Sequence, residues 1–183
     1  MQSSKLPINT GSDLGLFCAP ITVEQTLPLR HSVLWPNKPI SHVYLPEDEA
    51  GLHLGAFVGS LDEPVAVISL FIEPLPVSNN VPFDQDHGVQ SNVMRFRKFA
   101  CDPTYQGRGI GSRLLQFSLE RAHSELNCTI AWCDARTSAS AWYIKRGMMP
   151  FGERFFKGPV EYIRMCIDIG PRSTQGTDID TRV

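Results

Sequence analysis

The sequence lacks the features that mark membrane-spanning and secreted proteins. It contains no apolar run of about 18 residues, the length at which a transmembrane helix becomes a candidate. Met1–Asp13 is polar and has no apolar core of signal-peptide length. We therefore expect a soluble, cytoplasmic protein with no membrane partner.

Strong charge is also missing. The formal net charge is −2, and the most basic segment is only Arg95–Lys98, with the sequence RFRK. Proteins that bind nucleic acids carry larger basic patches, which neutralise phosphates. The sequence therefore predicts no nucleic-acid partner and favours a small molecule or a protein as substrate.

The cysteines form no recognisable disulfide or metal-binding pattern. Their number is odd, and neither C-x-x-C nor a His/Cys ligand spacing occurs. We therefore expect reduced, mostly buried thiols and no metal site. The cysteines are Cys18, Cys101, Cys128, Cys133 and Cys166.

The composition is that of one globular α/β domain. Hydrophobic residues make up 42% of the 183 residues and charged residues 20%, which suits a chain that buries its own core. We predict a flexible N-terminal arm over residues 1–15, a single domain over 16–169 and a disordered tail over 170–183. The tail prediction depends on the near absence of apolar residues after Gly170.

Hydrophobic patterns and breaker residues predict the elements of the domain. Helices are expected over Thr26–Pro36, with Thr26 as N-cap, and from Ser138 as N-cap to Gly147. Pro46–Glu49 is expected to be a solvated acidic turn, and residues 73–91 a long loop. Strands are predicted over residues 16–21, 53–58, 65–71, 93–101, 129–133, 149–156 and 160–167. Those over 53–58 and 65–71 should pair antiparallel, and the last two are expected to form a closing pair around residues 157–159.

Asn92–Phe117 carries the most informative motif. A strand ends near Cys101, a glycine-rich turn covers residues 106–111, and apolar residues then recur at helical spacing. Such a turn presents backbone N–H groups and the positive end of the helix dipole to a phosphate. The sequence therefore predicts an anion-binding turn, to which Arg108 and Arg113 add positive charge.

The glycine spacing fits neither G-x-x-x-x-G-K-[ST] nor G-x-G-x-x-G, two common phosphate-binding motifs. It matches [QR]-x-x-G-x-[GA] through Gln106, Gly109 and Gly111. Downstream, Ala139–Met148 is similar to A-x-x-[FL]-Y-x-K-x-G-F, with Tyr143 at the tyrosine position. The two patterns, in this order, resemble the GNAT superfamily of acyl-CoA N-acyltransferases over about residues 53–168.

The resemblance implies an α/β (α+β) fold with a mixed, mostly antiparallel central sheet flanked by helices. The sheet would splay open between the strands that end near Cys101 and Cys133, and acetyl-CoA would lie in that gap as cosubstrate. No metal is implied. The implied cofactor-binding residues are Phe99, Ala100, Cys101, Gln106, Gly107, Arg108, Gly109, Ile110, Gly111, Ser112, Arg136 and Tyr143.

The implied reaction is direct attack of a primary amine on the thioester. Tyr143 would protonate the departing CoA thiolate, and a backbone N–H near Cys101 would hold the oxyanion. The general base is open, because this chain has Ala131 where some members carry a glutamate. Glu73, Asp134 or a water relay could serve, and Arg136 replaces an asparagine that many members carry.

Several alternatives remain at the level of sequence. The acceptor is first a small amine metabolite and second a peptide or protein N-terminus or lysine. A homodimer is compatible with the resemblance. Two other readings are a catalytically silent acyl-CoA-binding domain and a thiol-dependent acyltransferase that uses Cys101 with a histidine. For Tyr143, packing of the ring on the sheet is the alternative to catalysis.

Overall fold

The computed structural model describes residues 15–60, 62–76 and 92–171. The predictions for the N-terminal arm and the C-terminal tail, and most of the predicted long loop, lie outside the described residues. The described chain forms two compact units. The first unit comprises the described residues within 1–71 and 97–118. The second unit comprises the described residues within 72–96 and 119–183.

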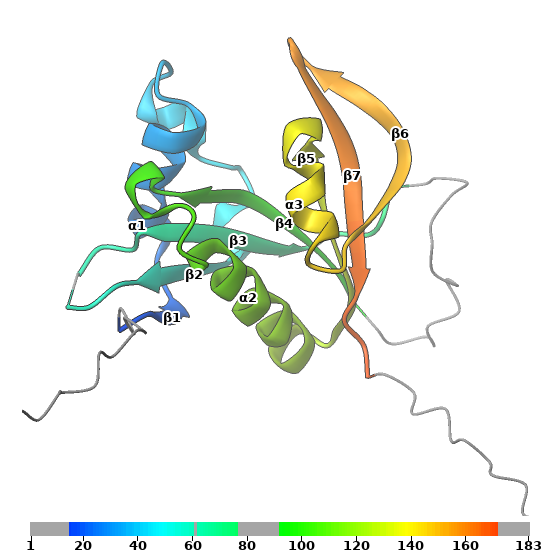
Figure 1. Ribbon diagram of the computed structural model, residues 1–183, viewed down its shortest axis with the longest axis horizontal. Helices are drawn as coiled ribbons and strands as arrows, with labels where there is room; N and C mark the ends of the chain where they lie inside the picture. Colours follow the sequence, from blue (N-terminus) through cyan, green and yellow to red (C-terminus); the bar gives the residue numbers. More distant parts are fainter. Residues whose placement is uncertain (1–14, 61, 77–91, 172–183) are drawn as a thin grey trace, which may run out of the picture. The chain divides into compact units, whose positions relative to one another are not determined.

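Seven strands hydrogen-bond in the order β1-β2-β3-β4-β5-β7-β6 (Figure 1). The β4–β5 pair is parallel, whereas the β1–β2, β2–β3, β5–β7 and β6–β7 pairs are antiparallel. This mixed, mostly antiparallel open sheet with its helices confirms the predicted fold class. The strands are β1 (Phe17–Pro20), β2 (Leu52–Phe57), β3 (Ala66–Ile72), β4 (Asn92–Cys101), β5 (Cys128–Arg136), β6 (Met149–Lys157) and β7 (Val160–Asp168).

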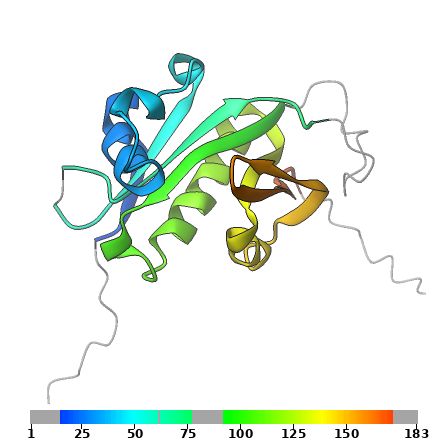
Figure 2. The ribbon, with the colours of Figure 1, turned by 90° about the horizontal axis from the view of Figure 1, so that it is seen from above.

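In the first unit, α1 (Val23–Leu29) and the start of α2 (Ile110–Leu126) lie on opposite sides of β3. Val67 packs with Leu29 of α1, and Ser69 accepts a hydrogen bond from Arg30, which follows α1. The alternate residues of β3 point the other way, because side chains alternate along a strand. Figure 2 shows α1 and the start of α2 on opposite sides of these strands.

The first helix begins four residues earlier than predicted. Thr22, not Thr26, is the N-cap: its hydroxyl accepts from the backbone N–H of Gln25, and the Gln25 side chain accepts from the backbone of Thr22. This reciprocal capping box satisfies two N–H groups that the helix itself leaves unpaired. Thr26 is instead buried. The helix continues as a π-helical turn over Arg30–Leu34 and ends before Pro36, as predicted.

β4 and α2 follow the prediction closely. β4 ends at Cys101, and α2 runs from Ile110 to Leu126. Asn127 ends the helix in a left-handed conformation (φ 52°). Lys98 is also left-handed (φ 53°), which interrupts the regular alternation within β4. The apolar side of α2 is buried through Ile110, Leu114, Leu115 and Ala122.

In the second unit, β5 is longer than predicted and leads into a shorter helix. Thr137–Ala139 forms a 3₁₀ turn, so Ser138 lies within that turn and is not an N-cap. α3 covers Ser140–Ile144, and the chain leaves it through Gly147 (φ 84°), which has the positive φ expected of a residue after a helix. The predicted closing pair, β6 and β7, is an antiparallel hairpin, and Phe151, Trp132 and Cys166 form a buried cluster.

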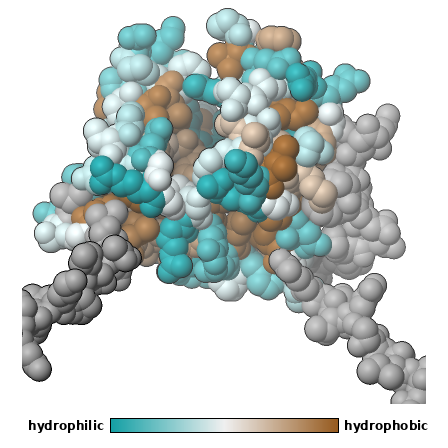
Figure 3. All heavy atoms as spheres, viewed as in Figure 1, coloured by the Kyte–Doolittle hydropathy of each residue, from teal (hydrophilic) through white to brown (hydrophobic). Residues whose placement is uncertain are grey.

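Exposed apolar side chains are scattered over the described residues. On the face seen in Figure 3 they lie among hydrophilic residues. None of the helices in the described part of the chain is both long enough and apolar enough to cross a membrane. The large exposed apolar residues are Phe17, Ile40, Tyr44, Ile72, Ile144, Met149 and Phe156.

Candidate active site

The glycine-rich turn lies in the first unit and needs glycine for its backbone conformation. Gly107 and Gly109 have φ values of 76° and 81°, and a Cβ added at either position would meet no atom within 4 Å. Left-handed conformations disfavour residues that carry a Cβ. The turn is exposed, and the backbone N–H of Arg113 already bonds to the carbonyl of Gly109, so α2 starts directly at the turn.

Two side chains tie this turn to the end of β4. Gln106 donates through Nε2 to the carbonyl oxygen of Cys101 at 3.0 Å. Asp102 accepts from the backbone N–H and the hydroxyl of Thr104 at 2.8 and 2.7 Å, which caps the 3₁₀ turn Pro103–Tyr105. Sequence reasoning assigned Gln106 to the cofactor and missed this contact. The Asp-Pro-Thr sequence is a signal that could have identified the cap.

The remaining residues predicted to bind the cofactor in this unit lie along the same segment. Phe99, Ala100 and Cys101 are the last residues of β4, and the guanidinium of Arg108 lies 5.5 Å from the centre of the Tyr105 ring. Burial raises the pKa of the Cys101 thiol, and the nearby Asp102 raises it further. A thiolate is therefore disfavoured there, which argues against a thiol-dependent acyltransferase.

Tyr143 lies in α3 of the second unit and contacts one residue of β4 and one of β5. Its ring centre is 5.9 Å from that of Phe96 in β4, and its hydroxyl hydrogen-bonds with the thiol of Cys133 in β5. Burial raises the pKa of Tyr143 well above its ordinary value, Cys133 adds to this effect, and Arg146 opposes it. The phenol therefore keeps its proton at neutral pH.

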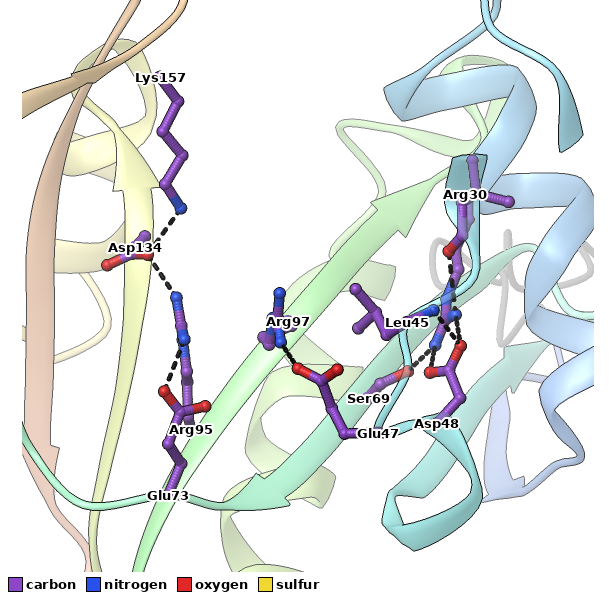
Figure 4. Close-up of polar contacts among 11 residues, drawn as sticks. Arg30, Leu45, Glu47, Asp48, Ser69, Glu73, Arg95, Arg97, Asp134 and Lys157 are labelled. Carbon is purple, nitrogen blue, oxygen red and sulfur yellow. Dashed lines mark hydrogen bonds and ion pairs between the residues drawn. The ribbon is translucent and has the colours of Figure 1, made fainter. Parts of the chain in front are cut away.

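The two predicted base candidates, Glu73 and Asp134, both bind the side chain of Arg95, which was not among the predicted site residues. Arg95 of β4 donates through Nη1 to Glu73 at 2.7 Å and through Nη2 to Asp134 (Figure 4). Arg95 also stacks over Trp132, 4.5 Å from the ring centre, and Trp132 donates to the backbone oxygen of Glu73 at 3.0 Å. The RFRK segment carried no sign of this arrangement.

Two cationic side chains of the β6–β7 hairpin also contact Asp134. Lys157 donates to Asp134 Oδ2 at 2.7 Å, from the side opposite Arg95 in Figure 4. Arg164 lies directly across the ladder from Asp134, with Nε 3.8 Å from Oδ1. Arg136, two residues beyond Asp134, is exposed at the end of β5 and pairs in register with Tyr162. By strand alternation, Arg136 shares the sheet face of Asp134, whereas Cys133 faces Tyr143.

The first unit contains a buried polar network that the sequence did not predict. The turn at Pro46–Glu49 was expected to be solvated, yet Asp48 is buried and binds the fully buried Arg30 through both oxygens at 2.7 and 2.8 Å. Arg30 also donates to Ser69 at 2.7 Å, and His53 contacts the Ser69 hydroxyl and the backbone oxygen of Asp48. A buried charge needs such a partner, and only folding brings residues 30 and 48 together.

The structure therefore distributes the predicted site residues over both units. The first unit holds the glycine-rich turn and residues 99–101; the second brings Glu73 and Asp134 together on Arg95 and places Tyr143 against Cys133. Among the described residues, no three His, Cys, Asp or Glu side chains are grouped so that they could hold a metal ion.

Comparisons with known proteins point to one family. A family model described as "Acetyltransferase (GNAT) family" matches residues 22–148. A Bacillus subtilis protein named "Uncharacterized N-acetyltransferase YitI" is 28% identical over 137 residues, which cover 74% of this chain and 83% of that protein.

Two solved structures illustrate the likeness in fold. A putative N-acetyltransferase from Lactobacillus plantarum has a TM-score of 0.66 and 17% identity, over 84% of this chain and 98% of that one. Arabidopsis thaliana NAA60, solved in complex with acetyl-CoA, has a TM-score of 0.63 and 12% identity, over 84% of this chain and 98% of that one. At these identities the likeness shows the fold.

Proposed function

The chain belongs to the acetyltransferase (GNAT) family, and on that premise we propose that it transfers the acetyl group of acetyl-CoA to a primary amine. The observation that carries the proposal is the glycine-rich turn: it starts α2 with two left-handed glycines and matches the family pattern at Gln106, Gly109 and Gly111. The pyrophosphate of acetyl-CoA would bind the N–H groups of this turn, with Arg108 and Arg113 supplying charge.

The amine must be made nucleophilic before it attacks. An aliphatic amine of ordinary pKa is free base in only a small fraction at pH 7, which amounts to about 4.6 kcal/mol that a base or desolvation must supply. Of the two candidates, Glu73 is the more accessible. Its side chain is 36% exposed and makes one ion pair with the described residues, whereas Asp134 is 10% exposed and contacts three of their cations. We assign the base to Glu73, acting directly or through water.

The leaving thiolate needs a proton. Tyr143 is the proposed donor, because its raised pKa keeps the phenol protonated and α3 holds it against Phe96 and Cys133. The oxyanion would be held by a backbone N–H in the last residues of β4, beside the left-handed Lys98. The reaction then proceeds by direct attack, without an acyl-enzyme on Cys101, whose thiol pKa is raised.

Calorimetry with acetyl-CoA tests the cofactor. Gly109→Val should weaken binding, because valine disfavours the left-handed φ on which the turn depends. The matched control is Gly59→Val: Gly59 is also left-handed (φ 62°) with open space around it, but lies between β2 and β3. Equal affinity in the parent and Gly109→Val, or no binding by the parent, would refute the proposed cofactor site.

A second measurement separates an enzyme from a silent binding domain. CoA release is followed with a library of primary amines that includes small metabolites and short peptides with free N-termini. Release that depends on the amine supports the transferase. Tight binding of acetyl-CoA without release for any amine would support the silent domain instead.

A further inference from the structure

One sheet face of the second unit concentrates positive charge. Strand register and alternation place Asp134 and Arg136 of β5 on the same face as Arg164 and Tyr162 of β7, which lie directly opposite them. Phe155 of β6 pairs with Tyr162, and Lys157 follows two residues later on the same face. Together with Arg95, this face, which we call the cationic face, carries the cations Arg95, Arg136, Lys157 and Arg164.

The acids in contact with these cations do not balance them. Glu73 and Asp134 are its two carboxylates in ionic contact with the cations, so four positive charges face two negative ones. Two more acids of the described chain share the face without an ionic contact to these cations: Glu153 is exposed in the bulge of β6, and Asp168 lies four residues along β7 from Arg164. The excess of positive charge is therefore local to the surroundings of Asp134. This local excess stands out in a chain whose formal net charge is −2.

Hydrogen-bonding capacity on the cationic face is also unused. Arg95 Nε is a buried donor without a hydrogen-bond partner among the described residues. Arg164 Nε and Asp134 Oδ1 also lack one there, because the 3.8 Å between them is an ion-pair distance and too long for a hydrogen bond. Native proteins satisfy nearly all buried polar atoms, so such a group of unpaired atoms needs an explanation. An anionic ligand would add an acceptor beside Arg164, whose side chain is 28% exposed.

Aromatic rings on the cationic face form a platform for its cations. Phe155 and Tyr162 stack with ring centres 5.9 Å apart, and Arg164 and Lys157 lie 4.8 and 4.9 Å from the centres of Phe155 and Tyr162 respectively. Contacts of cations with ring faces hold the cationic groups at the platform. The Lys157 side chain is nevertheless 49% exposed, so its charge is accessible from solvent.

The cationic face lies back to back with the proposed acid. Phe96 and Cys133 contact Tyr143, and the adjacent residues Arg95 and Asp134 point to the other side of the same two strands. An acceptor on the cationic face would therefore approach from the side opposite Tyr143. In the tetrahedral intermediate the amine and the departing sulfur are different substituents of one carbon, so the proton donor at the sulfur and the acceptor site need not share a face of the sheet.

We propose that the cationic face binds a carboxylate of the acceptor, so that the substrate is an amine that also carries a carboxylate group. This inference rests on the proposed acetyltransferase function. Lys157, Arg164 and the exposed Arg136 would contact the carboxylate, which replaces the cofactor contact that the resemblance implied for Arg136. Asp134 would hold the cations in place, and Glu73 would remain at the edge toward the amine. No bond is made or broken in this step, which is recognition alone.

The test compares matched acids and amides. The probes are glycine, gamma-aminobutyrate and para-(aminomethyl)benzoate, each beside its own primary amide, and affinity is measured by ligand-observed NMR in the presence of CoA. Charge-assisted hydrogen bonds should favour at least one acid over its amide by about tenfold or more. Lys157→Gln and Arg164→Gln should each reduce this preference by about fivefold or more. Because binding is read without turnover, the result does not depend on finding an acetylated product.

Arg154→Gln is the matched control. Arg154 lies on the same strand as Lys157 but pairs with Glu161 on the opposite face, and its side chain is 67% exposed. This variant should keep the acid preference within about twofold. Equal affinity for acid and amide in every pair would overturn the inference, as would a preference that survives both Lys157→Gln and Arg164→Gln.

The same panel separates this inference from the proposed function. Acids and amides that are acetylated equally well would leave the transferase in place and overturn carboxylate recognition. Acids that bind through Lys157 and Arg164 without any CoA release from acetyl-CoA would support carboxylate recognition and overturn the transferase.

Discussion

Asp48→Asn removes one charge from a buried ion pair and nearly preserves the size of the side chain. Arg30 is fully buried. The Asp48 carboxylate accepts hydrogen bonds from both Nη groups of Arg30 and, at 2.8 Å, from the backbone N–H of Leu45. In the variant, the Arg30 guanidinium stays buried without a counter-charge. Loss of one partner of a buried ion pair costs about 3–5 kcal/mol in free energy of unfolding.

The adjacent carboxylate provides the matched control. Glu47 pairs with Arg97, but their side chains are 40% and 27% exposed, so water screens the interaction. Exposed ion pairs contribute about 0–1 kcal/mol, and Glu47→Gln should cost no more than that. For a domain of this size, these values correspond to a fall in melting temperature of about 6–20 °C for Asp48→Asn and at most about 4 °C for Glu47→Gln.

The pH dependence provides a second signature. Burial raises the pKa of the Asp48 carboxyl, but hydrogen bonds from Arg30 and Leu45 and the charge of Arg30 outweigh it, so the pKa lies below its usual 3.8. A carboxyl whose pKa is lowered by folding stabilises the protein above its unfolded pKa, and this stabilisation is lost as the pH falls through the folded value. Asp48→Asn lacks this contribution. The difference in free energy of unfolding between the parent and Asp48→Asn should therefore become smaller below pH 3.8.

Urea unfolding at pH 7 and at a series of acid pH values measures both effects. The m-value should stay constant, so that the midpoint reports stability alone. Equal losses in Asp48→Asn and Glu47→Gln at pH 7 would refute the reasoning. A difference between parent and Asp48→Asn that stays constant in acid would refute the pKa argument.

Two further predictions concern Tyr143, and a third concerns two buried cysteines. Tyr143→Phe should lower kcat by about 10²–10⁴-fold with little change in melting temperature. An unchanged kcat would remove Tyr143 from the mechanism. A fall in melting temperature together with kcat would favour a packing role. Deprotonation of Tyr143 should lower kcat of the parent only above pH 10.0, because burial raises the pKa of this phenol. A fall in kcat at lower pH that is absent in Tyr143→Phe would contradict this prediction. Burial raises the pKa of Cys128 to about 11 and of Cys166 to about 12, so iodoacetamide at pH 8 should label both slowly in the native protein, and rapid labelling monitored by mass spectrometry would show otherwise.

The sequence determined those features that depend on neighbouring residues. The end of β4 at Cys101, the glycine-rich turn and the start of α2 follow from proline, glycine and helical spacing within one short segment. The hairpin β6–β7 and the antiparallel pairing of β2 with β3 were predicted for the same reason. Where local signals competed, prediction was less exact: Thr22 and Gln25 cap α1 together, whereas Thr26 alone looked like a cap.

Only the tertiary structure decided which charged residues meet. Arg30 and Asp48 are 18 residues apart, and Arg95 is 39 residues from Asp134, so no local pattern links them. Whether a charge is solvated or buried depends on the elements that fold over it, which is why Asp48 was taken for a solvated residue. Likewise, the sequence named Glu73 and Asp134 as candidate bases, but the register of β5 with β7 and the reach of Arg95 placed them on one cationic face.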